Sequence, residues 1–243
     1  MADKSGLYPP LNRLKPVAGN VFIVDGPAIR FGPPGLKMPF PTRMTVLRLE
    51  EGLFIHSPTA LTADLKAEIE ALGPVRFLIG PNRLHYWWIP DWREAFRQAE
   101  VYLAPRIGEQ AKGRIAFPTL PLDRENGYPW DREILTLPVT GSYMTEAIFF
   151  HKASRTLILT DFIENFEHAT GFTKLLIRLG GVRAPDGQMP RDMRFTFRKA
   201  RPPLKEAVER MIAWNPERIV IAHGRWFEEN GAAELKRAFR WLL

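Results

Sequence analysis

Four residues that can bind metals or transfer protons stand at or just beyond the ends of short apolar runs. They are His56 after residues 53–55, His85 after residues 77–79, Asp161 after residues 157–160 and His223 after residues 219–222. Imidazole and carboxylate groups serve as metal ligands and as general acids or bases. Because the carboxyl ends of neighbouring strands meet at one edge of an open α/β sheet, we expect these four side chains to share one site.

Each of these residues also has an ordinary structural interpretation. A single histidine at a strand end is often only hydrogen-bonded to its neighbours. Asp161 can cap a helix that follows it, and His223-Gly224 can form a turn. Glu146 can act as a general base, support a histidine or pair with Arg155 across the next turn. The same placement on four separate runs is what favours a shared site.

The elements that must position this site are short strands and amphipathic helices. Strands are predicted at residues 21–24, 45–49, 53–56, 75–79, 101–103, 134–137, 147–150, 156–160 and 218–222. Helices are predicted at residues 62–72, 90–99, 162–179, 203–214 and 232–242. The proline- and glycine-rich segments 25–42, 104–130 and 182–203 are predicted to be surface loops. Strands that alternate with helices indicate a layered α/β domain.

Composition limits the chemistry and the partners. A chain of 243 residues, 45% of them hydrophobic, can bury a sizeable core. It has no cysteine, so any metal must be bound by His, Asp or Glu. The net charge of +7 comes without a nucleic-acid-binding motif, and we attribute it to surface arginine rather than to a nucleic-acid partner. Nucleophile-elbow, Walker and dinucleotide-binding motifs are absent from the sequence.

The apolar stretches are too short for a membrane anchor. Residues 1–20 lack the apolar core of a signal peptide. No stretch reaches the roughly 18 consecutive apolar residues of a membrane span. We therefore expect a cytoplasmic protein without a membrane partner.

Several stretches resemble DUF4336, a family described as a domain of unknown function, within the metallo-β-lactamase-like fold. The stretches are residues 43–49, 53–58, 80–85, 145–151 together with 154–161, and 221–224. The resemblance implies a four-layer αββα sandwich formed by residues 21–243, after an N-terminal arm at residues 1–20. It also implies a metal site at one edge of the sheets.

The resemblance further implies that this site is degenerate. Active members of the superfamily bind one or two metal ions through a dense H-x-H-x-D-H run, a His after a Gly, a strand-ending Asp and a late His before a Gly. Here the dense run is replaced by Asn82-Arg83-Leu84-His85, and the Gly-His pair by Gly141-Ser142. Asp161 and His223 match the last two positions.

The remaining residues suffice for one metal ion and not for two. His85, Asp161 and His223 are the implied ligands, and His56 is a fourth ligand or a base. A catalytic zinc needs about three protein ligands, whereas a two-metal site needs more. Two histidines and a carboxylate also suit iron or manganese, so the divalent metal stays open among these three.

Two functions fit this interpretation. The first is a mononuclear metal-dependent hydrolase of an ester, amide or phosphoester, with His56 and Asp161 as catalytic residues and His85, Asp161 and His223 as metal ligands. The second is a non-catalytic, degenerate member that acts as a ligand-binding or scaffolding module. The sequence identifies neither the small-molecule substrate nor the oligomeric state.

Overall fold

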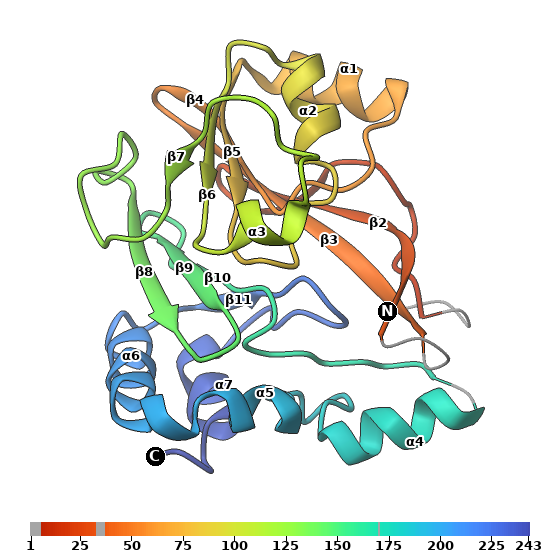
Figure 1. The fold of residues 1–243 in the computed structure, drawn as a ribbon, viewed down its shortest axis with the longest axis vertical. Coiled ribbons are helices and arrows are strands. Elements are labelled where there is room, and N and C mark those ends of the chain that lie inside the picture. Colours follow the sequence, from red (N-terminus) through yellow and green to blue (C-terminus); the bar gives the residue numbers. More distant parts are fainter. Residues whose placement is uncertain (1–5, 33–36, 170) are drawn as a thin grey trace.

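The computed structural model describes residues 6–32, 37–169 and 171–243, which form two β-sheets packed face to face between helices (Figure 1). One sheet has the strand order β1-β2-β3-β4-β5-β6-β7, and the other has the order β11-β10-β9-β8. The strands are β1 (Lys15–Ala18), β2 (Val21–Phe31), β3 (Met38–Leu49), β4 (Gly52–His56), β5 (Val75–Gly80), β6 (Glu100–Leu103), β7 (Leu120–Pro121), β8 (Ile134–Thr140), β9 (Thr145–His151), β10 (Thr156–Ile158) and β11 (Arg218–Val220). Every strand predicted from the sequence overlaps one of these.

Helices cover both outer faces of the paired sheets (Figure 1). They are α1 (Ala63–Leu72), α2 (Ile89–Ala95), α3 (Ile107–Ala111), α4 (Gly171–Gly180), α5 (Arg191–Thr196), the 3-10 helix η1 (Arg198–Ala200), α6 (Arg201–Ala213) and α7 (Gly231–Ala238). Helices α1 and α2 lie on the outer side of the first sheet, and α6 and α7 on the outer side of the second. None of these helices has the length and apolar character needed to cross a membrane.

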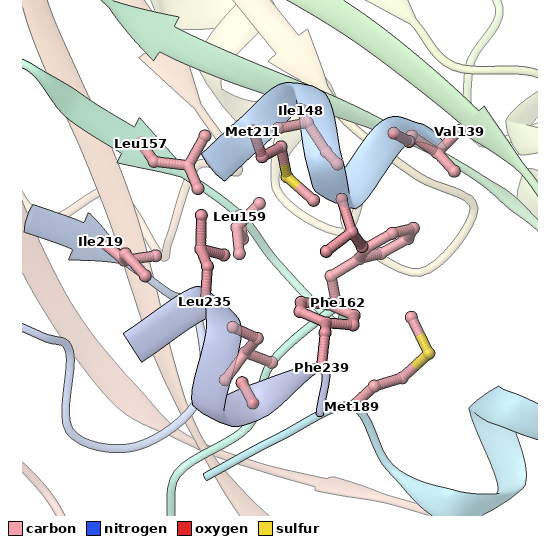
Figure 2. Close-up of a cluster of buried hydrophobic side chains, with 14 of the residues drawn as sticks. Val139, Ile148, Leu157, Leu159, Phe162, Met189, Met211, Ile219, Leu235 and Phe239 are labelled. Carbon is pink, nitrogen blue, oxygen red and sulfur yellow. The ribbon is translucent and has the colours of Figure 1, made fainter. Parts of the chain in front are cut away.

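Buried side chains separate into three layers that follow the period of two in each strand. On β4, Leu53 and Ile55 pack against α1 and α2, whereas Phe54 points toward the second sheet. On β9, Phe149 packs between the sheets, whereas Ile148 faces α6 and α7. Figure 2 shows this last layer, in which side chains of the second sheet meet those of the two helices. The order helix, sheet, sheet, helix confirms the predicted αββα sandwich.

Strand direction brings the polar strand ends together. Strand β4 runs parallel to β5, with His56 opposite Ile79, and β10 runs parallel to β11, with Ile158 opposite Val220. The carboxyl ends within each pair therefore lie side by side. The two sheets also touch at this edge, where the Ala147 amide of β9 donates a hydrogen bond of 2.8 Å to the Pro81 carbonyl.

Sequence predictions about several connecting segments were wrong. The loop predicted at residues 104–130 contains the short helix α3, and the loop predicted at residues 182–203 contains α5 and η1. The segment predicted as a loop at residues 25–42 is largely strand, because β2 and β3 continue as an antiparallel pair beyond an irregular register between Gly26 and Ile29. Pro27 falls in this irregularity, where a ladder hydrogen bond is not required of it. The helix predicted at residues 162–179 begins only at Gly171 in α4. Before it, residues 164–166 pair as isolated bridges with residues 188, 224 and 183.

Candidate metal centre

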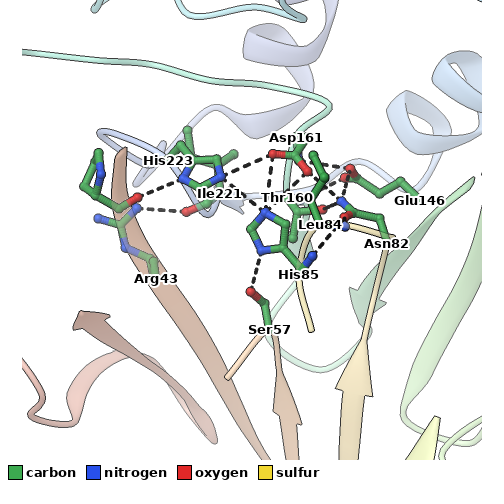
Figure 3. A network of polar contacts seen from close by, with 11 residues as sticks. Arg43, Ser57, Asn82, Leu84, His85, Glu146, Thr160, Asp161, Ile221 and His223 are labelled. Carbon is green, nitrogen blue, oxygen red and sulfur yellow. Dashed lines mark hydrogen bonds and ion pairs between the residues drawn. The ribbon is translucent and has the colours of Figure 1, made fainter. Parts of the chain in front are cut away.

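Two histidines and an aspartate meet where the two sheets adjoin (Figure 3). His85 Nε2 and His223 Nε2 lie 3.2 Å apart. Asp161 Oδ1 lies 3.2 Å from His223 Nε2 and 3.4 Å from His85 Nε2. Asp161 and His223 are buried and His85 is half-buried. These three side chains, from loops after β5, β10 and β11, form the one group of three potential ligands found among the described residues.

His223 is held in one orientation by its backbone and by its second ring nitrogen. Its Nδ1 lies 2.8 Å from the Pro41 carbonyl oxygen. A carbonyl oxygen can only accept, so Nδ1 carries the proton and Nε2 of a neutral ring presents its lone pair to the centre. The following Gly224 has φ +93°, and a Cβ there would lie 2.1 Å from the Asn165 carbonyl oxygen. Only glycine allows the loop this close approach.

His85 is oriented by residues from two different loops. Ser57 Oγ lies 2.6 Å from His85 Nδ1, which leaves Nε2 directed at the centre. Asn82 Oδ1 accepts hydrogen bonds from the backbone amides of Leu84, at 2.8 Å, and of His85, at 3.2 Å. Asn82 therefore shapes the turn that carries His85. Ser57 itself adopts φ +53°, a conformation that is uncommon for a residue with a Cβ.

Asp161 is fixed by a buried network behind the centre. Asn82 Nδ2 donates to Asp161 Oδ2 at 2.6 Å. Glu146, from β9, accepts the backbone amides of Thr160 at 2.8 Å and of Asp161 at 2.9 Å. Glu146 thus positions the backbone of Asp161, and it neither contacts a histidine nor pairs with Arg155 as the sequence suggested. Arg155 instead donates to the Asn215 carbonyl.

The electrostatics of the centre favour an ionised Asp161 and raise the basicity of His223. Burial alone would raise the pKa of Asp161, but the charge and hydrogen bonds of the two histidines hold that pKa well below its usual range. Burial alone would lower the pKa of His223, but the hydrogen bond and charge of Asp161 outweigh it and raise that pKa. Burial, with the charge of Asp161, raises the pKa of the Glu146 carboxyl. Negative charge therefore concentrates on Asp161, the carboxylate that faces both imidazoles.

The separations between the three ligand atoms fit a single metal ion. Ligands that each lie about 2.1 Å from one ion are about 3.0 Å apart at octahedral angles and about 3.4 Å apart at tetrahedral angles. The observed separations of 3.2, 3.2 and 3.4 Å fall within this range. The donor set of two imidazole nitrogens and one carboxylate oxygen suits zinc, iron or manganese.

His56, predicted as a fourth ligand or a base, lies outside this three-residue group. Its ring is buried between the sheets and packs edge-on against Phe149, with ring centroids 5.5 Å apart. Its Nε2 has no hydrogen-bond partner among the described residues. Burial, with a smaller contribution from His85, lowers the pKa of His56 to about 3, so the ring is neutral. A catalytic role for His56 stays a prediction.

The centre lines a cavity of about 680 Å³. Ser57, His85, Asp161 and His223 are part of this lining, together with Glu164. The Glu164 carboxyl has no hydrogen-bond or ion-pair partner in the part of the chain that the structure describes, and burial raises its pKa to about 8. Sequence reasoning missed Glu164 because it lay within the helix predicted at residues 162–179. Its position three residues after Asp161 was the one available signal.

Sequence comparison identifies a family for this chain. In sequence, the family described as "Domain of unknown function (DUF4336)" matches residues 35–171. No curated protein gave a sequence match to this chain.

Solved structures with the same fold differ strongly from this chain in sequence. A metallo-β-lactamase from Pontibacter korlensis superposes with a TM-score of 0.62 at 10% identity, covering 95% of this chain and 98% of its own. The metallo-β-lactamase FIM-1 from Pseudomonas aeruginosa, in its mono-zinc form, gives 0.57 at 12% identity, with 95% and 96% covered. Rubredoxin oxygen:oxidoreductase from Desulfovibrio gigas gives 0.61 at 13% identity, with 95% of this chain and 61% of that one covered.

These likenesses establish the architecture, and the family match covers more than half of the chain. The centre built from His85, Asp161 and His223 adds a feature that is compatible with metal binding. The chain therefore belongs to the DUF4336 family and has the metallo-β-lactamase fold.

Proposed function

We propose that this protein is a hydrolase that uses one divalent metal ion to cleave an ester, amide or phosphoester. The observation that carries this proposal is the convergence of His85 Nε2, His223 Nε2 and Asp161 Oδ1 within 3.4 Å of one another in the lining of a cavity. A divalent ion bound there supplies a Lewis acid, which polarises the bond to be cleaved and makes water more acidic. The mono-zinc form of FIM-1 is a precedent for a single ion in this fold.

A single ion is favoured because protein hydrogen bonds occupy the other side of Asp161. Its Oδ2 accepts from the Asn82 amide at 2.6 Å, and the same amide nitrogen lies 3.2 Å from Glu146 Oε2. An amide donor cannot ligate a metal through that nitrogen. A second ion bridged by Asp161 would have to displace this network.

We assign Glu164 the role of the group that moves protons during hydrolysis. It lines the cavity beside Asp161 and His223, and its carboxyl has no competing partner among the described residues. In the reaction, the water oxygen bonds to the carbonyl carbon or phosphorus, and the bond to the leaving group breaks. Glu164 gives its proton to the leaving oxygen or nitrogen and regains one from the attacking water, so the proton count balances.

The metal requirement is tested on untagged protein stripped with a chelator and reloaded separately with Zn²⁺, Fe²⁺ or Mn²⁺. We expect one metal ion per chain by elemental analysis, and hydrolysis of p-nitrophenyl acetate or bis(p-nitrophenyl) phosphate only in a loaded form. A protein that binds no metal, or that binds one and cleaves no ester, amide or phosphoester, contradicts the proposal. The second of these results would instead favour the non-catalytic ligand-binding module, which the large apolar cavity also suits.

The role of Glu164 predicts the kinetics of one isosteric variant. In Glu164→Gln, kcat should fall by about 100-fold or more, because general acid–base catalysis typically contributes that much. Metal content should not change, since Glu164 is outside the ligand group. Glu228→Gln is the matched control, because Glu228 is exposed and does not line the cavity. Equal kcat values for the two variants would exclude Glu164 from the chemistry.

A further inference from the structure

The cavity wall next to the metal centre is formed by aromatic rings, beginning with the ring that contacts His223. The Phe40 ring packs edge-on against the His223 ring, with centroids 5.3 Å apart. Phe31 packs edge-on against Phe40 at 6.0 Å, which continues the wall away from the centre along β2 and β3. Phe166 contacts Phe40 from the other side at 5.4 Å. Any group that extends from the centre in this direction meets hydrocarbon.

Helix α4 supplies the facing wall. Leu176, Ile177 and Leu179 of α4 line the cavity, together with Val182 just after the helix. On the β2–β3 side, Ile29 and Met38 line it as well and are half-buried. Apolar side chains thus line the cavity on two sides, and its polar lining includes the metal ligands and also Arg191 and Asp192 of α5.

We propose that the cavity binds an apolar acyl or aryl group, and that the protein hydrolyses esters, amides or phosphoesters of lipophilic compounds. This inference rests on the proposed hydrolase function. The scissile bond lies at the metal ligands beside Glu164, and the apolar part of the substrate occupies the space between Phe31 and α4. A volume of about 680 Å³ is ample for such a group, since small-molecule sites span about 300–1,000 Å³ and are mostly apolar.

Binding of the apolar group is tested on metal-free protein, so that hydrolysis does not contribute to the measured heat. Metal-free protein is titrated with primary alcohols from 1-butanol to 1-decanol by isothermal calorimetry. Affinity should rise roughly fourfold per added methylene, as expected for burial of hydrocarbon, until the cavity is filled. The heat-capacity change should be negative. Affinities that do not depend on chain length would overturn the proposal.

Two neighbouring leucines of α4 provide a matched pair of variants. Leu176→Glu places a carboxylate in the cavity and should weaken 1-decanol binding by about tenfold or more. Leu175→Glu adds the same charge to the same helix at a residue that is 50% exposed and outside the cavity, so binding should not change. Thermal melts establish that both variants are folded. Equal affinities of the two variants for 1-decanol would place the bound chain elsewhere.

Metal-loaded protein separates failure of this inference from failure of the hydrolase proposal. With p-nitrophenyl esters, kcat/KM should rise from acetate to decanoate, and Leu176→Glu should remove most of the rise. Hydrolysis without any preference for decanoate would overturn the lipophilic substrate and leave the hydrolase standing. Chain-length-dependent alcohol binding with no hydrolysis under any metal would support the apolar site and refute the hydrolase.

Discussion

Replacing His223 with alanine is expected to cost the protein its metal ion and its hydrolytic activity together. The variant removes one of three ligand atoms and leaves Asp161 and His85, which cannot complete the three-ligand set of a catalytic site. Changing residues that only support ligands costs about 10- to 100-fold in metal affinity, so loss of a ligand should cost at least about 100-fold. Elemental analysis after dialysis and ester hydrolysis measure the two effects in one preparation.

The control for His223→Ala is a histidine that lies outside the centre. His168 is exposed and does not belong to the ligand group, so His168→Ala should keep both metal and activity. His85→Ala should behave as His223→Ala does. Retention of one metal ion per chain by His223→Ala, with activity intact, would show that the ion binds elsewhere.

Replacing Arg43 with alanine is expected to lower the free energy of unfolding by about 3 kcal/mol, the low end for breaking a buried ion pair. Arg43 Nη2 lies 2.6 Å from Asp25 Oδ1, and both side chains are almost fully buried. Arg43 Nη1 donates to the Ile221 carbonyl at 2.8 Å (Figure 3). It also donates to the Gly224 carbonyl at 2.7 Å, so it contacts the chain on both sides of His223. The variant leaves these groups with fewer partners, although Lys15 still pairs with Asp25 at 2.9 Å.

A second arginine on the same strand tests whether the loss of stability depends on the position of the arginine or only on its residue type. Arg48 also lies on β3, but it is exposed, and its guanidinium donates to the Asn20 side chain at 3.0 and 2.8 Å. Arg48→Ala should change stability by no more than about 0.5 kcal/mol, as is usual for surface substitutions. Urea unfolding of both variants measures the difference. If Arg43→Ala were no less stable than Arg48→Ala, the link between β3 and the His223 loop would be energetically unimportant.

The short distances within the centre follow from how the loops of its ligands are held. Each ligand lies on a loop directly after a buried strand, and hydrogen bonds from distant segments hold each loop in place. Arg43 donates to the loop of His223, and Glu146 accepts from the backbone of Asp161 and its neighbour Thr160. Asn82 contacts the elements of both His85 and Asp161. Ligands on separate loops can then meet within 3.4 Å without any being adjacent in the sequence.

The sequence by itself determined the strands and the residues at their ends. Short continuous apolar runs rich in Ile, Val, Leu and Phe are typical of buried strands, so their local composition was sufficient to predict β4, β5, β10 and β11. Parallel pairing then made it predictable that His85, Asp161 and His223 would lie at one edge. That placement depends on strand direction and not on side-chain detail.

Only the tertiary structure decided what surrounds these ligands. Residues 162–168 carry a helix-like apolar pattern, but their backbone pairs with residues 183, 188 and 224 instead of forming a helix. This pairing places Glu164 at the cavity and forces glycine at position 224. Likewise, the separation of His56 from the ligand group and the apolar cavity between β2–β3 and α4 arise from contacts between segments far apart in the chain. Such contacts produce no periodic pattern in the sequence of either segment. Each contact depends on the shape of another segment of the chain, which the first segment's own residues do not specify.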